Sequence, residues 1–137
     1  MAIVEYGPPL SLAEAKRVIE AAEAEASANQ WAMVIAVLDS SAHLVALHRM
    51  DHAQYASAEV APAKGRTALN FKRSTKVFEE GLAAGQLRWL AMPDICPLEG
   101  GLLITKDGRI AGAIGVSGGT AAQDAQVAAA GAKVLGG

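Results

Sequence analysis

The chain has 137 residues, of which 52% are hydrophobic and 19% are charged, and its formal net charge is −2. This length fits a single domain, and the composition is too apolar and too weakly charged for a disordered chain or for a protein that binds nucleic acid through phosphate contacts. Because no apolar run reaches the ~18 residues of a membrane span and no signal peptide is visible, we expect one cytoplasmic domain over residues 1–137, without nucleic-acid or membrane partners.

The first third of the chain predicts a helix followed by a β-hairpin. Ser11 and Glu14 have the spacing of a capping box, and the apolar residues after them recur at helical intervals, which predicts a helix over residues 12–28. Residues 33–38 are a short apolar run rich in β-branched side chains, and they predict a buried strand. Residues 43–50 follow a polar turn and predict the returning strand of the hairpin.

Two helices are predicted in the middle of the chain. Residues 55–71 have helical character, but Pro62 lies among them, and proline is favoured at the first position of a helix. We therefore expect the regular part of this helix to begin near Pro62. Ser74 is a candidate N-cap for a short helix over residues 75–84, which Gly85 ends.

The last third of the chain predicts a second hairpin and a terminal helix. Two apolar runs, 101–105 and 109–116, are joined by an Asp-Gly turn, which is a strong hairpin signal. Thr120 begins a second capping box, and the alanine-rich helix after it is expected to extend to about residue 135. Hairpins flanked by helices predict an α/β (α+β) fold in which helices pack on a central antiparallel sheet.

Alanine is unusually frequent and accounts for 30 of the 137 residues. The predicted core is therefore built from small side chains, which allow backbones to approach one another closely. Because a small domain buries a limited share of its surface, we expect the chain to complete its burial by self-association.

The end of the second predicted strand is rich in groups that bind metals. His48-Arg49-Met50-Asp51-His52 places two imidazoles, a carboxylate and a thioether within five residues, which suggests a site for a metal ion or for haem iron. However, His48 and His52 are four residues apart, a spacing that brings side chains together on a helix and not at the end of a strand. The alternative is a polar strand end, where Arg49 and Asp51 pair with each other or anchor the following loop.

Three other features each have a chemical and a structural interpretation. Lys64 lies on a face lined by alanine, where it either reaches the carboxylate of a ligand or is a solvated charge with a buried stem. The glycine-rich turn 115–120 either binds an anion through its N–H groups or is only a packing turn between strand and helix. Cys96 has no neighbour in sequence that favours a thiolate, so we expect a small buried residue there and not a nucleophile.

Segments spread along the chain together resemble one protein family. The most specific of them is residues 112–120, with Gln123-Asp124 after it. The ordered set, over residues 12–135, is similar to the GlcG/HbpS-like haem-binding proteins, also called the domain-of-unknown-function 336 (DUF336) family. The other segments of the set are the alanine-rich first helix, residues 35–39, His43-Leu44, Arg49-Met50-Asp51, residues 63–68 and Gly100-Gly101-Leu102.

This resemblance implies a profilin-like α/β/α sandwich that assembles into homo-oligomers, and we expect a tetramer or an octamer. It also implies haem as the cofactor. The first hypothesis is therefore a protein that binds haem noncovalently in a cleft between subunits, with His48, His52, Lys64 and Arg66 as contributing residues. No Cys-x-x-Cys-His motif is present, which excludes covalent attachment of haem, and we expect no separate metal-ion site.

The second hypothesis is an enzyme of the same fold, an isomerase or lyase that acts on a small acid. Its general base would be Glu99 or His48, because a carboxylate or imidazole near basic groups suits proton transfer on such a substrate. A third hypothesis is a noncatalytic accessory protein of a catabolic operon, and the sequence leaves open whether the chain is an enzyme. The residues that would bind the small-molecule acid are Arg49, Lys64 and Arg66, together with the turn Gly118, Gly119 and Thr120.

Overall fold

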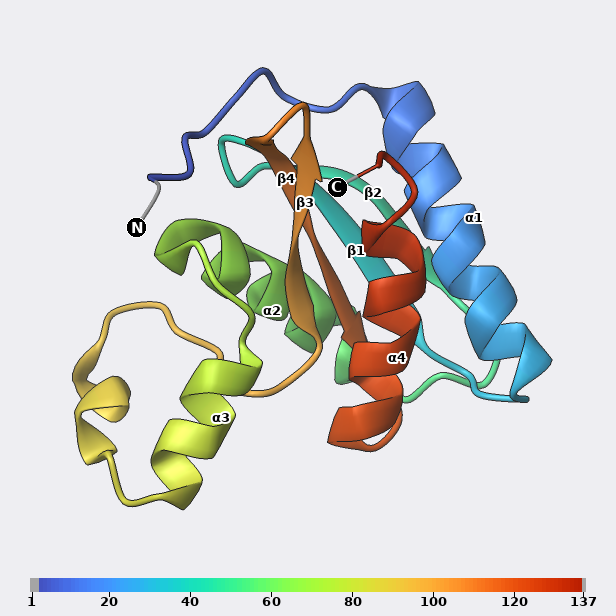
Figure 1. The fold of residues 1–137 in the computed structure, drawn as a ribbon. Helices are drawn as coiled ribbons and strands as arrows, with labels where there is room; N and C mark the ends of the chain where they lie inside the picture. Colours follow the sequence, from blue (N-terminus) through green and yellow to red (C-terminus); the bar gives the residue numbers. More distant parts are fainter. Residues whose placement is uncertain (1–2, 137) are drawn as a thin grey trace.

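A four-stranded antiparallel sheet forms the middle layer of the computed structural model, which describes residues 3–136 (Figure 1). The strands stand in the order β2-β1-β4-β3. Each neighbouring pair is antiparallel, so the predicted central antiparallel sheet is confirmed. The strands are β1 (Val34–Asp39), β2 (Leu44–Arg49), β3 (Gly101–Lys106) and β4 (Arg109–Ser117).

Helices cover both faces of this sheet (Figure 1). On one face α1 (Leu12–Ala28) and α4 (Ala121–Ala132) pack side by side, and on the other face lies α2 (Ser57–Phe71). A shorter helix, α3 (Lys76–Ala83), and the 3-10 helix η1 (Leu87–Ala91) project from the body of the molecule. The α/β/α sandwich expected from the sequence is therefore confirmed. Within residues 3–136, none of the helices combines the length and the apolar character that crossing a membrane requires.

The two capping boxes predicted from the sequence begin α1 and α4. Ser11 Oγ accepts a hydrogen bond from the Glu14 N–H at 3.1 Å, and the Glu14 carboxylate accepts one from the Ser11 N–H at 2.9 Å. Thr120 and Gln123 form the same reciprocal pair at the start of α4. Each box satisfies N–H groups that a helix end leaves free, so both helices begin where the spacing predicts. Helix α1 has the predicted bounds, whereas α4 ends at Ala132 and not near residue 135.

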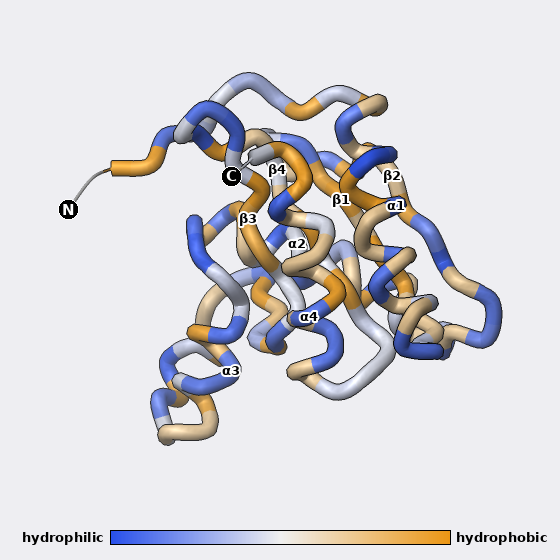
Figure 2. Tube along the Cα trace, turned by 45° about the vertical axis from the view of Figure 1, so that its right-hand side comes forward, coloured by the Kyte–Doolittle hydropathy of each residue, from blue (hydrophilic) through white to orange (hydrophobic). Residues whose placement is uncertain are grey.

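The two central strands are buried on both faces. In β1, alternate side chains point to opposite layers, as the period of a strand requires. Figure 2 shows hydrophobic residues along the strands in the middle of the molecule, with hydrophilic residues on the outer segments. In β1, Ile35 and Val37 belong to the core under α1 and α4, and Val34, Ala36 and Leu38 belong to the core under α2.

The turn between β3 and β4 has the geometry that its Asp-Gly sequence predicts. The φ angles of Asp107 and Gly108 are 53° and 77°. A two-residue turn with both central residues in the left-handed region matches the twist of the strands that it joins. The predicted hairpin is therefore confirmed.

The start of α2 differs from the prediction. The helix begins at Ser57, and Pro62 lies inside it and not at its first position. A shorter i→i−3 bond, from the Ser57 N–H to the Gln54 carbonyl, starts the helix upstream of the proline, so the proline removes only one helical bond. The short helix α3 begins at Lys76, and the Ser74 hydroxyl accepts the Lys76 N–H at 3.2 Å.

Helix α2 lies close to β4 because glycines occupy the contact. A Cβ atom at Gly115 would overlap the carbonyl oxygen of Ala61 and the backbone nitrogen of Gly65. A Cβ atom at Gly65 would overlap the Leu38 side chain and come within 3.3 Å of the Gly115 nitrogen. Neither glycine has a positive φ. Glycine is therefore required at both positions by the close approach of the two backbones and not by the geometry of a turn.

We expect Gly115→Ala to lower the free energy of unfolding by about 3 kcal/mol or more, because the added methyl group meets backbone atoms that cannot rotate away. Gly85→Ala is the matched control, because Gly85 has a φ of 87° but nothing within 4 Å of an added Cβ. It should lose only about 1 kcal/mol from backbone strain. Urea denaturation measures the free energy of unfolding of both variants. Equal losses of stability in the two variants would contradict the role of the close approach between α2 and β4.

Candidate functional site

Some of the residues that the sequence suggests for a site lie in two hollows of the surface. The first, the Arg49 pocket, has a volume of about 590 Å³ and is lined by the consecutive residues 49–55. The second, the Lys64 pocket, has a volume of about 280 Å³ and is lined by residues from α2, α3, α4 and the end of β4. Gln54, just before α2, lines both pockets. The Arg49 pocket contains Arg49 and His52 of the predicted residues, and the Lys64 pocket contains Lys64, Glu99 and Gly119.

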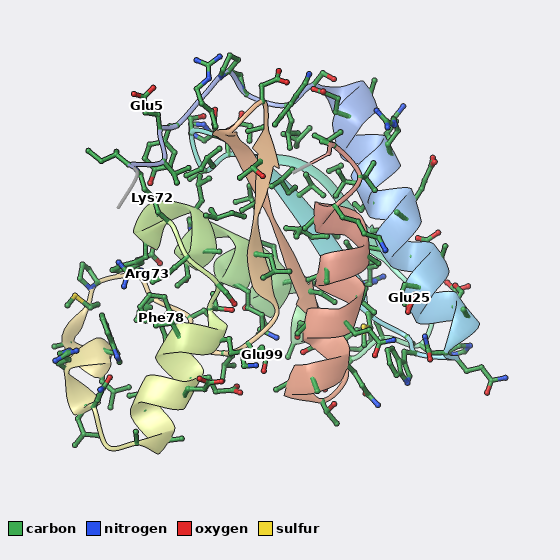
Figure 3. All side chains as sticks on the ribbon, in the orientation of Figure 1. Glu5, Glu25, Lys72, Arg73, Phe78 and Glu99 are labelled. Atoms are coloured by element: carbon green, nitrogen blue, oxygen red, sulfur yellow. The ribbon has the colours of Figure 1, made fainter. Side chains whose placement is uncertain are left out.

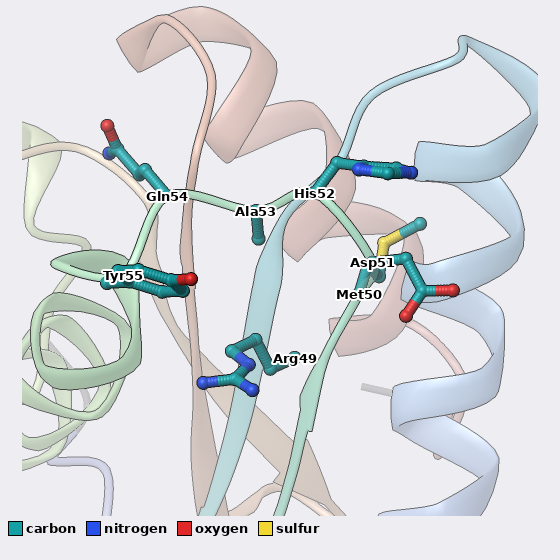
Figure 4. A pocket seen from close by; sticks show the side chains of 7 residues that line it. All are labelled: Arg49, Met50, Asp51, His52, Ala53, Gln54 and Tyr55. Atoms are coloured by element: carbon teal, nitrogen blue, oxygen red, sulfur yellow. The ribbon is translucent and has the colours of Figure 1, made fainter.

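The Arg49 pocket forms where β2 ends and the chain turns toward α2. The guanidinium carbon of Arg49 lies 5.9 Å from the centre of the Tyr55 ring, and the ring is 84% exposed. Figure 4 shows the Arg49 and Tyr55 side chains directed toward each other, with the His52 ring on the other side of the loop backbone. His52 has a φ of 71°, a left-handed conformation, and it is one of the residues that line the pocket. The pocket therefore presents a guanidinium beside an aromatic ring, and an imidazole at its rim.

A neighbouring hollow of about 540 Å³ lies on the α1 side of the same segment. It is lined by Glu23 and Trp31, among others, and it shares Arg49, Met50 and Asp51 with the Arg49 pocket. The two hollows therefore adjoin at these three residues.

His48 belongs to neither the Arg49 pocket nor the Lys64 pocket. In the register of the sheet it pairs with Ile35, so it lies on the face of α1, whereas Arg49 pairs with Val34 on the face of α2. Its Nδ1 atom lies 2.9 Å from a carboxylate oxygen of Glu23. The two imidazoles therefore do not converge, as expected from their spacing at a strand end, and His48 ties β2 to α1.

Lys64 is buried, with only 3% of its surface exposed. Its ammonium donates to a carboxylate oxygen of Asp124 and to the Val116 carbonyl, both at 2.9 Å. Asp124 is equally buried and also accepts the Gly119 N–H at 2.9 Å. Burial raises the pKa of the Asp124 carboxyl, although the Lys64 ammonium and the Gly119 N–H favour its ionised form. The interpretation of Lys64 as a solvated charge is therefore wrong, because the charge is neutralised inside the protein.

The glycine-rich turn uses most of its N–H groups within the chain. The Gly119 N–H binds Asp124, and the Thr120 N–H binds the side chain of Gln123 at 3.0 Å. Gly118 has a φ of 146°, and a Cβ atom there would meet backbone atoms of the segment before β1. Two of the three N–H groups suggested as anion donors are thus engaged, which favours the interpretation as a packing turn.

Glu99 lies in the Lys64 pocket with two further carboxylates, those of Glu79 and Asp124. Figure 3 shows Glu99 on the segment that leads into β3, between α3 and α4. Its backbone N–H donates to a carboxylate oxygen of Glu79 at 3.4 Å. The pocket is therefore lined by three carboxylates and a single ammonium, that of Lys64, and has an excess of negative charge.

Arg66 and Cys96 lie outside both pockets. The Arg66 Nε atom is 3.5 Å from a carboxylate oxygen of Asp94, which is 74% exposed. Cys96 is half-buried, and its N–H donates to the Thr67 hydroxyl at 2.9 Å. Burial raises the pKa of the Cys96 thiol, which disfavours its thiolate form. Across residues 3–136, no cluster of three or more His, Cys, Asp or Glu side chains could hold a metal ion.

The sequence interpretation missed Asp124 and Tyr55. A signal for Asp124 was present, because in α4 it shares one helical face with Val127, Ala128 and Gly131, and all of these residues are buried. A carboxylate on an otherwise apolar helical face requires a buried partner. No comparable pattern indicates Tyr55, since its proximity to Arg49 depends on the path of the loop between β2 and α2.

Comparisons with known proteins identify close similarities over most of the chain. The model of the family described as "Haem degrading protein HbpS-like" matches residues 10–133. Protein GlcG of Escherichia coli K12 is 45% identical over 108 residues, which are 79% of this chain and 81% of GlcG. A double mutant of HbpS from Streptomyces reticuli has a similar structure, with a TM-score of 0.86 and 28% identity over 100% of this chain and 97% of that one. A crystal structure of PduOC in complex with haem has a TM-score of 0.82 and 27% identity, covering 93% of this chain and 97% of PduOC.

We expect Lys64→Met and Asp124→Ala each to lower the free energy of unfolding by about 3–5 kcal/mol, because each leaves a buried charge without its partner. The double variant Lys64→Met/Asp124→Leu should lose less than the sum of the two. Lys76→Met is the matched control, since Lys76 and Glu80 form an exposed pair at 3.6 Å that contributes about 0–1 kcal/mol. Urea denaturation measures these losses, and equal losses for Lys64→Met and Lys76→Met would contradict the prediction.

Proposed function

The chain belongs to the HbpS-like family, and on this premise we propose that it binds haem noncovalently in the Arg49 pocket. The observation that carries this proposal is the set of groups around one hollow of about 590 Å³: a guanidinium, an exposed aromatic ring, a thioether and an imidazole, together with the carboxylate of Asp51. That volume lies within the range of cofactor sites. The similarity to PduOC, whose crystal structure contains haem, also supports the proposal.

The residues of this pocket fit the chemistry of haem. The Arg49 guanidinium is suited to a propionate, because its planar fork binds carboxylates with two hydrogen bonds. The exposed ring of Tyr55 offers an apolar face to the macrocycle. His52 is the imidazole that we assign as the iron ligand, the residue type that most often holds haem iron. When bound, haem supplies one-electron and oxygen chemistry.

The other residues suggested for haem have partners inside the chain. His48, Lys64 and Arg66 pair with Glu23, Asp124 and Asp94, respectively. A propionate would have to displace a carboxylate at each of these positions. The haem proposal therefore rests on Arg49, Tyr55 and His52.

The charge of the Lys64 pocket disfavours the hypothesis of an isomerase or lyase for a small acid. Glu79, Glu99 and Asp124 line this pocket against the single ammonium of Lys64. A pocket with an excess of negative charge repels an anionic substrate. His48, the other candidate base, lies on the opposite face of the sheet in a pair with Glu23.

We also propose that the chain forms a homo-oligomer, a tetramer or an octamer, in which a second subunit covers the Arg49 pocket. The supporting observations are an exposed aromatic ring at this pocket and an exposed apolar side chain at the other end of the edge strand β2. Tyr55 at its mouth is 84% exposed, and Leu44 on the edge strand β2 is 53% exposed. An edge strand presents unpaired backbone groups that another chain can cover.

Titration of the purified protein with haemin, followed by absorbance, tests the haem proposal. We expect a Soret band that saturates at one haem per subunit. His52→Ala should abolish the change that iron ligation causes in this band, and Arg49→Ala should weaken binding about tenfold through the lost propionate contact.

His48→Ala is the matched control for this titration, because it removes an imidazole four residues away that is paired with Glu23. It should bind haem as the wild type does. A titration without saturation would overturn the haem proposal and leave the accessory-protein hypothesis. Loss of the Soret band in His48→Ala and not in His52→Ala would overturn the assignment of the ligand.

Size-exclusion chromatography with light scattering tests the assembly. We expect the mass of a tetramer or octamer at micromolar concentration. Tyr55→Glu should shift the population toward smaller species, because it places a charge in the proposed contact. A wild-type mass equal to that of a single chain at these concentrations would contradict the proposal.

A further inference from the structure

The loop between β2 and α2 carries His52, the proposed iron ligand, yet it has little regular structure. Its backbone is held by a bond from the Met50 N–H to the Met33 carbonyl at 3.0 Å and by turn bonds such as that from the Ala53 N–H to the Met50 carbonyl at 3.2 Å. The φ of 71° at His52 costs free energy in a residue that has a Cβ atom. Such a conformation persists only where the surrounding structure enforces it, so contacts of the loop side chains matter here.

Gln54 and two buried serines form a hydrogen-bonded chain from this loop to the sheet. The Gln54 Nε2 atom donates to the Ser57 hydroxyl at 3.0 Å, and the Oγ atoms of Ser57 and Ser117 lie 2.9 Å apart. Gln54 belongs to the loop, Ser57 is the first residue of α2, and Ser117 is the last residue of β4. Ser57 is 0% exposed and Ser117 is 5% exposed. The loop is thus tied to a central strand through two buried hydroxyl groups.

Burial determines the direction of this chain. The Ser57 hydroxyl accepts the Gln54 N–H and has one proton of its own to donate. Apart from Gln54, Ser117 is the only partner of this hydroxyl in the part of the chain that the structure describes. A buried hydroxyl proton without an acceptor is costly. Ser57 therefore donates to Ser117, which lines the Lys64 pocket and can direct its own proton there.

Ser57 is linked to the Arg49 pocket through Gln54. The pocket is lined by residues 49–55, and Ser57 is not among the residues that line it or the Lys64 pocket. Figure 4 shows Gln54 on the loop between His52 and Tyr55. The bond from Gln54 to Ser57 therefore anchors the segment that joins the proposed iron ligand to the proposed aromatic contact.

We propose that Ser57 is a positioning residue for the iron ligand. By holding Gln54, it keeps the loop in the conformation in which His52 lines the Arg49 pocket, and this role rests on the proposed haem function. Without the Ser57 hydroxyl, the Gln54 amide and the Ser117 hydroxyl lose the partner that they share. The left-handed backbone of His52 is then held by the backbone bonds of the loop, which are few.

Amide hydrogen exchange of the protein without haem tests the positioning of the loop. Ser57→Ala should speed the exchange of the bonded amides in residues 50–56 about tenfold, because a loop that has lost a side-chain anchor opens more often. Thr67→Val is the matched control, since Thr67 is another buried residue of α2 whose hydroxyl makes two hydrogen bonds. It should leave the exchange of residues 50–56 unchanged. Equal exchange of this loop in Ser57→Ala and in the wild type would overturn the proposal.

The haemin titration supplies a spectroscopic readout that a loss of stability alone would not change. At saturating haemin, the Soret band of Ser57→Ala should lie between the bands of the wild type and of His52→Ala, because part of the population binds haem without the imidazole. Thr67→Val should have the wild-type band. A wild-type band in Ser57→Ala would overturn the positioning role.

A double variant tests whether Ser57 acts through Gln54. Gln54→Ala should shift the Soret band as Ser57→Ala does, and the combination of both changes should shift it no further, because the two residues belong to one chain. A further shift in the double variant would overturn the route through Gln54. Failure of the wild type to bind haem would overturn the haem proposal itself, whereas wild-type binding with an unchanged band in Ser57→Ala would overturn only the role of Ser57.

Discussion

The close contact of α2 with β4 determines where the charges of the Lys64 pocket lie. Gly65 and Gly115 allow the two backbones to touch. Lys64, which precedes Gly65, is thereby brought against the carbonyl of Val116, which follows Gly115. The ammonium is then too deep for water to solvate it, so it requires a carboxylate within the protein. Asp124, on the buried face of α4, is that carboxylate.

This ion pair connects layers that the sheet otherwise separates. Helices α2 and α4 lie on opposite faces of the sheet, and the pair joins them at the end of β4. Asp124 also accepts the Gly119 N–H, so one carboxylate holds both α2 and the turn that leads into α4. The Lys64–Asp124 pair therefore links α2 to the glycine-rich turn.

The sequence predicted the elements better than the site, because their causes are local. A capping box such as Ser11 with Glu14, or an Asp-Gly turn, is satisfied by neighbouring residues. The start of α2 was wrongly predicted near Pro62, because backbone hydrogen bonds upstream of the proline start the helix earlier. The presence of the proline does not determine those bonds. Lys64 and Asp124 are 60 residues apart, so no local pattern pairs them. Only the helical period, which puts each on a buried face, could have indicated that both needed partners.

The two pockets suit different chemistry because their charges are compensated differently. Arg49 faces the ring of Tyr55 at 5.9 Å and forms no ion pair within residues 3–136, so its guanidinium is available to the carboxylate of a ligand. Lys64 is fully compensated by Asp124 and has no charge to offer. A guanidinium without an ion-pair partner in residues 3–136 therefore distinguishes the Arg49 pocket, and an ammonium paired inside the protein distinguishes the Lys64 pocket.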